Sequence, residues 1–391
     1  MTESLAALSA GEKRVAEAVL TRARGGRAEV RAAEVIWDRN QVVRLELADG
    51  HSAVLKRRAG DPDDDAAGQR FETELAALDL LSGMPAPVAP RLLGADPAAG
   101  ILVMEDLGQG ASLADSLLAG ERERAEADLA AYARALGSMH AWTMQRAPDP
   151  GAHPALERGP EWLTHIADGK EPFLAAAARL GLSAGGVAGE IDEITATLRD
   201  AGNVGLVHDD PCPDNVLLVD GVCRVVDFEG SGWGAVVLDA GYLIAPFPSC
   251  WCFASLPGEV AAPALGIYRG TLEAAGIRLG ADWDAEMLAA LAGFIVARGR
   301  RITEMLDEDP QWGTTTMRPR LLAWLSSFID RADGEAALPR LRALLGELHD
   351  QLSSRWPGTP VLEYPALARP GSEPVPAPDW WPPRPGVQVD P

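Results

Sequence analysis

The sequence is poor in cysteine and has no long hydrophobic run. Only four cysteines occur among 391 residues, which favours free thiols in a reducing compartment over a disulfide framework. The first 20 residues mix charged and apolar side chains, so they lack the continuous apolar core of a signal peptide, and no other stretch approaches a membrane span. We therefore expect a cytoplasmic protein with no membrane partner.

Positive charge is also scarce. Lys and Arg number 35 against 57 Asp and Glu, which gives a net charge of -22. An acidic protein repels phosphate backbones, which argues against a nucleic-acid partner. An acidic cleft would attract cationic small molecules, although solubility alone is the commoner reason for such a charge. With 47% hydrophobic residues, the chain can bury the core of a two-lobed soluble enzyme.

Two familiar ligand-binding patterns are incomplete. Residues 181–189 are rich in glycine but have no Gly-Lys-Ser/Thr ending, so they predict a turn between helices and not a phosphate loop. The pair Cys250 and Cys252 lacks the Cys-x-x-Cys or His-x-x-x-His that would complete a zinc site. On sequence alone, we expect no metal at these cysteines.

Periodicity divides the chain into a sheet region and a helical region. The N-terminal part predicts an amphipathic helix, a β-hairpin, a second helix and a buried strand, at residues 1–30, 42–56, 69–82 and 101–104. From residue 112 to about 352 the pattern is mostly helical. After Trp356, many prolines predict an extended or disordered tail.

These patterns predict an α+β fold with two lobes. A small N-terminal sheet lobe with one key helix would span residues 1–105, and a larger, mainly helical lobe would span residues 106–355. The tail would comprise residues 356–391.

Polar residues suited to phosphoryl transfer are concentrated after residue 207. Asp210 lies in a loop before a strand, where its carboxylate could accept the proton of a substrate hydroxyl. Asn215 and Asp227 flank an apolar hairpin with an Asp-Gly turn, which would bring their oxygens close to one Mg²⁺. Each residue alone is more simply explained by turn chemistry. Together they predict a catalytic base at Asp210 and metal ligands at Asn215 and Asp227.

Upstream, Lys56 and Glu74 form a second candidate pair. Lys56 ends a strand, and Glu74 shares a helix face with apolar side chains, so its carboxylate needs a partner. An ion pair would direct the Lys56 ammonium at a nucleotide's phosphates, unless Glu74 lies at the edge of the face and reaches solvent. We expect His208 to anchor its loop. We expect Asp239, which lies in an apolar run, to bind backbone amides or His208.

In this order, these residues resemble the aminoglycoside phosphotransferase family, small-molecule kinases of the protein-kinase-like superfamily. His208-Asp209-Asp210 with Asn215 resembles the family's His-Gly-Asp-x-x-x-x-Asn, and Asp227-Phe228-Glu229 its second motif. The resemblance implies ATP or GTP bound with Mg²⁺, the phosphate-binding Lys56 held by Glu74, and adenine bound at the backbone near Glu105 and Leu107.

Two features depart from the family pattern. Asp209 stands where the family has Gly, and we expect its side chain to face solvent without acting on the neighbouring base. Residues 37–43 have no glycine where protein kinases carry a Gly-rich loop, which argues against a protein kinase more than against a kinase.

By family analogy, the acceptor is an aminoglycoside or a similar amine-bearing alcohol, which leaves a role in antibiotic resistance open. A cluster of four acidic residues could bind its ammonium groups: Glu304, Asp307, Glu308 and Asp309. The alternatives are a kinase of another metabolite hydroxyl such as choline, a sugar or an amino acid, a nucleotide-binding pseudokinase, and an interaction protein that docks through its tail.

Overall fold

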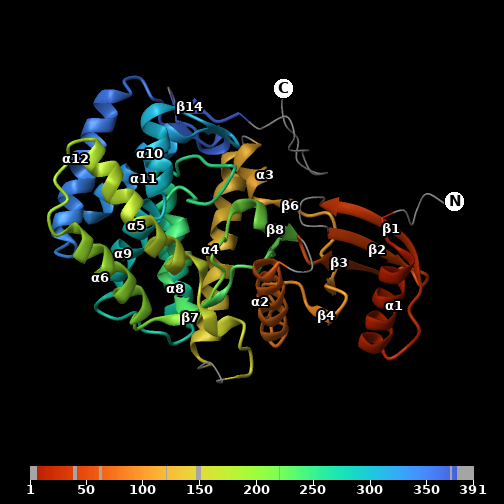
Figure 1. Ribbon diagram of the computed structural model, residues 1–391. Helices are drawn as coiled ribbons and strands as arrows, with labels where there is room; N and C mark the ends of the chain where they lie inside the picture. Colours follow the sequence, from red (N-terminus) through yellow and green to blue (C-terminus); the bar gives the residue numbers. More distant parts are fainter. Residues whose placement is uncertain are drawn as a thin grey trace.

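The computed structural model describes residues 7–37, 42–60, 64–119, 121–146, 151–219, 221–369 and 372–376. Figure 1 shows a sheet at one end of the molecule and a set of helices at the other. The predicted α+β class, with a sheet region followed by a mainly helical region, is confirmed. Residues 38–41, Asp220, Trp380 and Trp381, on which parts of the sequence predictions rest, lie outside the described residues.

The N-terminal sheet has five antiparallel strands in the order β1-β2-β3-β5-β4. The strands are β1 (Val30–Trp37), β2 (Val42–Leu47), β3 (Ser52–Arg57), β4 (Leu92–Asp96) and β5 (Ile101–Glu105). The predicted hairpin and buried strand are confirmed as β2, β3 and β5. The outer strands β1 and β4 were not predicted, because neither shows a regular alternation of buried and exposed residues.

The two faces of the sheet serve different purposes. Along β3, Ala53 and Leu55 point to one face, where they share a core with helix α1 (Ala10–Arg24). Because side chains alternate along a strand, Val54 and Lys56 point to the opposite face. That face adjoins helix α2 (Asp65–Leu81), which begins four residues before the predicted helix because Asp64 caps it.

The C-terminal region consists mostly of packed helices. The helices that pack most extensively are α4 (Arg122–Met144) against α8 (Gly258–Ala274) and α5 (Glu161–Arg179) against α10 (Gly299–Asp307). The remaining helices are α3 (Leu113–Leu118), α6 (Val187–Arg199), α7 (Val237–Ala240), α9 (Trp283–Val296), α11 (Met317–Ala332) and α12 (Pro339–Arg355). As predicted, the glycine-rich residues 181–189 hold the turn between α5 and α6.

Short strands carry the segments with site residues. β7 (Val204–Val207) pairs with β10 (Gly232–Ala235), while β8 (Val216–Val219) pairs with β6 (Ala111–Ser112) and β9 (Val222–Val225). Residues 208–215 therefore run from β7 to β8, and residues 226–231 run from β9 back to β10. This arrangement brings the two ends of the predicted hairpin together.

The prolines predicted an extended or disordered tail from residue 356, but several side chains of residues 356–369 belong to the hydrophobic core. Tyr364 and Leu367 are completely buried, around a short 3₁₀ turn at Pro365–Leu367. Apolar side chains spaced among the prolines account for this packing. Short strand pairs complete the structure: β11 (Gln311–Trp312) with β12 (Thr315–Thr316), and β13 (Leu362–Glu363) with β14 (Glu373–Pro374). Among the described residues, no helix has the length and apolar character needed to span a membrane.

Candidate active site

A cavity of about 580 Å³ lies between the sheet and the helical region. This volume is suited to a nucleotide-sized ligand. All seven residues predicted for the site line this cavity: Lys56, Glu74, Glu105, Leu107, Asp210, Asn215 and Asp227. The structure thus brings together side chains that are up to 171 positions apart in the sequence.

Lys56 lies at the centre of the ionic contacts in this cavity. Its Nζ is 2.6 Å from Glu74 Oε2 and 2.5 Å from Asp227 Oδ1, and Glu229 Oε2 lies 3.9 Å away. The predicted ion pair with Glu74 is confirmed. The alternative of a solvent-facing Glu74 is excluded, since only 4% of its side chain is exposed.

Three carboxylates around one ammonium leave the cluster with an excess of negative charge. Burial alone would lower the pKa of Lys56, but Glu74, Asp227 and Glu229 raise it above its ordinary value. Burial raises the pKa of Glu74 to about 7, with Lys56 opposing the shift and Asp227 adding to it. Burial and the charge of Asp227 also raise the pKa of Glu229. The ammonium is therefore firmly charged, while its anions would gain from a further cation.

These residues fit a hard divalent cation. Oxygens of Glu74, Asp227 and Glu229 lie within 4.8 Å of one another. The Asn215 side chain donates its Nδ2 hydrogen to the Asp210 carbonyl at 3.0 Å, and its amide oxygen is of a type that could bind such a cation. Asp227 has a φ of 71°, a left-handed conformation that costs a residue with a side chain about 1–3 kcal/mol. Such strain is typical of functional sites.

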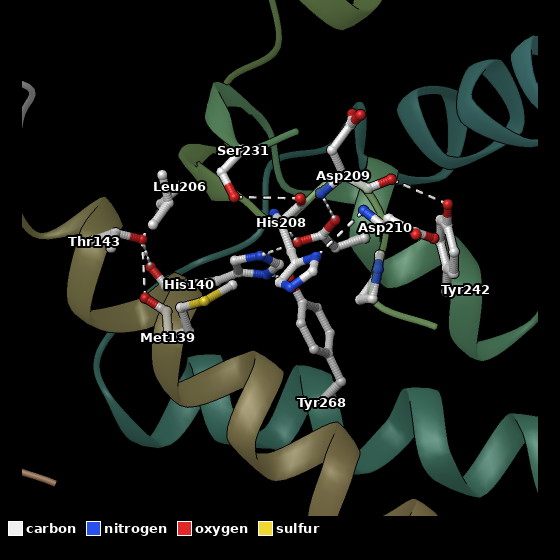
Figure 2. A network of polar contacts seen from close by, with 12 residues as sticks. Met139, His140, Thr143, Leu206, His208, Asp209, Asp210, Ser231, Tyr242 and Tyr268 are labelled. Atoms are coloured by element: carbon white, nitrogen blue, oxygen red, sulfur yellow. Dashed lines mark hydrogen bonds and ion pairs between the residues drawn. The ribbon is translucent and has the colours of Figure 1, made fainter. Parts of the chain in front are cut away.

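Asp239 holds the segment that carries Asp210. Its carboxylate accepts hydrogen bonds from the backbone N–H groups of His208, at 2.7 Å, and Asp209, at 3.0 Å. His140 of α4 lies 3.1 Å from the same carboxylate and 2.7 Å from the Tyr268 hydroxyl, and Figure 2 shows His140 and Tyr268 close to the segment His208–Asp210. The prediction that Asp239 binds backbone amides is confirmed.

His208 anchors its loop from the other side. Its Nε2 lies 2.9 Å from the Val226 carbonyl, and its Nδ1 accepts the Asp210 N–H at 3.3 Å. The ring therefore connects the Asp210 segment to the segment that carries Asp227. These contacts support the structural role predicted for His208.

The Asp210 carboxylate is held through one oxygen. Ser249 Oγ donates to Oδ1, and Cys212 Sγ donates to the same atom at 2.9 Å. Ser249 in turn contacts the Tyr242 hydroxyl at 2.8 Å. Within the described residues, Oδ2 is the oxygen that remains for a substrate hydroxyl.

The expectation that Asp209 faces solvent is wrong. Asp209 is only 6% exposed, and its Oδ1 accepts the backbone N–H of Trp162 at 3.2 Å. Trp162 is in the first turn of α5, whose N-cap residue, Pro160, provides no capping side chain. Asp209 therefore caps this helix from a distant part of the chain. Its φ of 78° also explains why glycine suits this position in the family pattern.

The segment after β5 is attached to the sheet by Arg44. Arg44 Nε donates to Asp106 Oδ2 at 2.8 Å, and Nη2 donates to the Gly108 carbonyl at 2.9 Å. The Glu105 N–H is already bound to the Arg91 carbonyl at 2.8 Å. For Leu107, no backbone hydrogen bond is found within the described residues, which leaves its N–H for a ligand.

Sequence reasoning missed several residues of the site. Ser249 belongs to no recognisable motif. Trp251 lines the cavity, although the sequence pattern around it indicates only the cysteines on either side. Val54 from the sheet, with Leu217 and Val226 from the helical region, provides apolar surface for a flat base. The sequence contained a signal for these three residues. Val54 is two positions from Lys56 and Leu217 two positions from Asn215, which is the spacing of one strand face, and Val226 directly precedes Asp227.

The four acidic residues considered for substrate binding lie elsewhere. None of them lines the cavity. Asp307 is paired with Arg179 at 2.8 Å and Glu304 with Arg301 at 3.0 Å, while Asp309 accepts the Arg318 N–H at 2.9 Å. Neighbouring arginines contact three of these four residues, and the cluster carries no argument about the substrate.

A strand lysine, a helix glutamate and an aspartate after a hairpin, gathered between a small sheet and a helical region, define the protein-kinase-like class of phosphotransferases. Residues 33–277 match the sequence model of the Phosphotransferase enzyme family (APH). The match covers more than half of the chain, which therefore belongs to this family. The resemblance recognised from the motifs is confirmed, and the chain is a small-molecule phosphotransferase.

Solved structures with a similar arrangement come from several branches of this family. The ternary complex of APH(2″)-IIa with streptomycin and ATP has 12% identity and a TM-score of 0.47, with 85% of this chain and 98% of that chain covered. A macrolide 2′-phosphotransferase from Brachybacterium faecium has 17% identity and a TM-score of 0.43, with 74% and 94% covered. A choline/ethanolamine kinase family protein from Mesorhizobium loti has 16% identity and a TM-score of 0.46, with 81% and 92% covered.

A comparison with curated proteins finds no match to this chain. Family membership therefore rests on the sequence match, because none of these structural likenesses reaches a TM-score of 0.5.

Proposed function

We propose that this protein transfers the γ-phosphoryl group of ATP or GTP to a hydroxyl group of a small, amine-bearing alcohol. The observation that carries the proposal is the convergence of the seven predicted site residues on one cavity. Family membership supports the reaction class, and the charges in the cavity support the class of acceptor.

On the donor side, each residue has a separate task. Lys56, held by Glu74, would bind the α- and β-phosphates, and the backbone at Glu105 and Leu107 would bind the base. Asn215 and Asp227 would hold Mg²⁺, which would neutralise charge on the β- and γ-phosphates. This assignment agrees with the excess of negative charge around Lys56, which a second cation would offset.

On the acceptor side, Asp210 would orient the substrate hydroxyl and accept its proton as the oxygen attacks phosphorus in line. Ser249 and Cys212 fix the carboxylate through Oδ1, so Oδ2 would face the hydroxyl. Transfer would be direct, without a covalent enzyme intermediate.

The cavity favours a cationic acceptor. Seven acidic side chains line it against two basic ones, and both basic residues are already paired with carboxylates. Trp251 lines the cavity together with Asp210, and its indole would suit an ammonium group.

A transfer assay across a panel of acceptors tests the proposal. Amino sugars, amino alcohols, neutral sugars and amino acids would be incubated with Mg²⁺ and either ATP or GTP, and phosphorylated product would be detected by mass spectrometry. We expect turnover with amine-bearing alcohols, its loss in Asp210→Ala, and full activity in Asp192→Ala, a matched change at an exposed aspartate of α6. Nucleotide binding without transfer to any acceptor would favour a pseudokinase, and preferred neutral acceptors would remove the amine from the proposal.

A further inference from the structure

Three of the four cysteines gather beside the catalytic segment. Cys212 lies two residues after Asp210, while Cys250 and Cys252 come from the loop that also carries Ser249. All three are at most 2% exposed. The fourth, Cys223 in β9, belongs to no group of possible metal ligands found among the described residues.

The geometry of this cluster suits a tetrahedral metal. Cys212 Sγ, Cys250 Sγ and a carboxylate oxygen of Asp214 lie within 4.8 Å of one another. Cys250 Sγ is 3.7 Å from Asp214 Oδ1. Zinc bound to sulfur at about 2.3 Å and to oxygen at about 2.1 Å with a tetrahedral angle separates the two ligand atoms by about 3.6 Å. The observed separation therefore needs almost no adjustment.

Outer contacts orient these ligand atoms. Trp251 Nε1 donates to Asp214 Oδ2 at 2.7 Å, which leaves Oδ1 facing Cys250. Cys252 Sγ lies 2.7 Å from Cys250 Sγ, which places a third sulfur directly beside the ligand atoms. The buried Arg320 donates to the Cys250 carbonyl at 2.6 Å and places a positive charge beside the thiols. Such contacts around the ligands are what a built metal site requires.

We propose that Cys212, Asp214 and Cys250 form a binding site for a thiophilic divalent cation of the zinc class. Two sulfurs and one carboxylate form a ligand set that zinc accepts and magnesium avoids. Asp214 and Trp251 line the nucleotide cavity, which gives a cation a route to the buried thiols. A tetrahedral site of this kind would keep a fourth position for water.

The binding site itself is independent of the proposed function, but its consequence for catalysis rests on that function. Cys212 donates its thiol hydrogen to Asp210 Oδ1 at 2.9 Å. A cation on the Cys212 sulfur would displace that hydrogen and place positive charge next to the base, which would weaken its ability to accept a proton. We expect occupancy to lower turnover.

The test uses the full chain, reduced and freed of metal, in excess Mg²⁺ so that carboxylate sites are saturated. Zn²⁺ affinity is measured by competition with a chromophoric chelator, and Cd²⁺ is added to detect thiolate-to-metal charge-transfer absorption. We expect one equivalent to bind with a thiolate band, at least about tenfold weaker binding in Cys250→Ser, and unchanged binding in Cys223→Ser, the matched control. Zn²⁺ should also lower transfer activity more in the wild type than in Cys250→Ser.

Three outcomes would overturn the inference. The first is the absence of a thiolate band with one equivalent of Cd²⁺ on the reduced wild type, a measurement that does not depend on whether a variant folds. The second is Zn²⁺ binding by a folded Cys250→Ser variant with wild-type affinity. The third is a mass deficit of two hydrogens without bound metal in protein isolated without reductant, which would assign Cys250 and Cys252 to a disulfide. If transfer activity fails but the band appears, the proposed function fails and the metal site stands.

Discussion

The excess of negative charge around Lys56 has a measurable effect on stability, and Glu74→Gln isolates it. Lys56 gains from its three carboxylates, whereas Glu74 loses more through burial than the ammonium returns. Glutamine has nearly the same volume as glutamate and removes only the charge. Replacement of Glu74 therefore tests whether its negative charge destabilises the folded protein when no ligand is bound.

The pKa of Glu74 sets the size and sign of this effect. Its pKa is raised from 4.5 to about 7 in the folded protein. Between these pH values the folded state retains a proton that the unfolded state has released, so stability falls as pH rises through this window. A difference of about 2.5 units corresponds to about 3 kcal/mol. With an unfolding entropy of about 0.8 kcal/mol/K for a chain of this size, this is a loss of about 4 °C in Tm.

The assay is thermal unfolding at pH 5 and pH 8 without Mg²⁺ or nucleotide. We expect the wild type to lose about 4 °C more than Glu74→Gln between the two pH values. Glu72→Gln, on the exposed side of the same helix, should follow the wild type. Equal losses in the wild type and Glu74→Gln would refute the charge argument. In transfer assays Glu74→Gln should raise the KM for nucleotide, because Lys56 would lose the carboxylate of Glu74 that holds it in place.

Substitutions at three further positions test the remaining parts of the site. Asp210→Ala should lower kcat at least about 100-fold with little change in nucleotide affinity, since general bases contribute roughly 10²–10⁴, and steady-state kinetics with isothermal titration would check both. Asp227→Ala should reduce the Tm increase that Mg²⁺ and nucleotide produce together, and an undiminished increase would remove Asp227 from the metal site. Asp209→Asn keeps an oxygen for the Trp162 N–H and tolerates the positive φ, so it should match or exceed wild-type Tm at pH 8. Asp209→Ala should lose about 0.5–2 kcal/mol as a lost cap and more from backbone strain.

Regular alternation made the inner part of the sheet predictable. β2, β3 and β5 alternate or are continuously apolar, and the helix that carries Glu74 shows its buried face in sequence. β1 and β4 were not predicted because an edge strand does not need a regular pattern of buried residues. The packing of Tyr364 and Leu367 escaped for a different reason: proline content predicts a lack of regular structure, and these side chains are buried without it.

The ionic part of the site was predictable because its residues are chemically demanding. A buried lysine and a buried glutamate both require partners, so spacing on a strand and a helix was enough to pair Lys56 with Glu74. Ser249 and Trp251 carry no such demand. Their roles depend on a loop whose path is set by the packing of α7 and the helices after it, which no local pattern encodes.

Asp209 shows where motif reasoning reaches its limit. Compared with the family pattern, an aspartate in place of glycine adds a charge beside the base. From the sequence, its contacts can be predicted only from its neighbours His208 and Asp210. The structure adds the N-terminus of α5, which follows Pro160 and has no capping side chain of its own. The backbone at residue 209 has a positive φ, and its side chain accepts the Trp162 N–H at that helix end. Burial raises the pKa of Asp209 well above its ordinary range, while the Trp162 N–H opposes that shift. Asp209, in place of the family's glycine, therefore helps to hold the catalytic segment against α5. We expect it to affect catalysis by positioning Asp210 more than by adding a charge beside it.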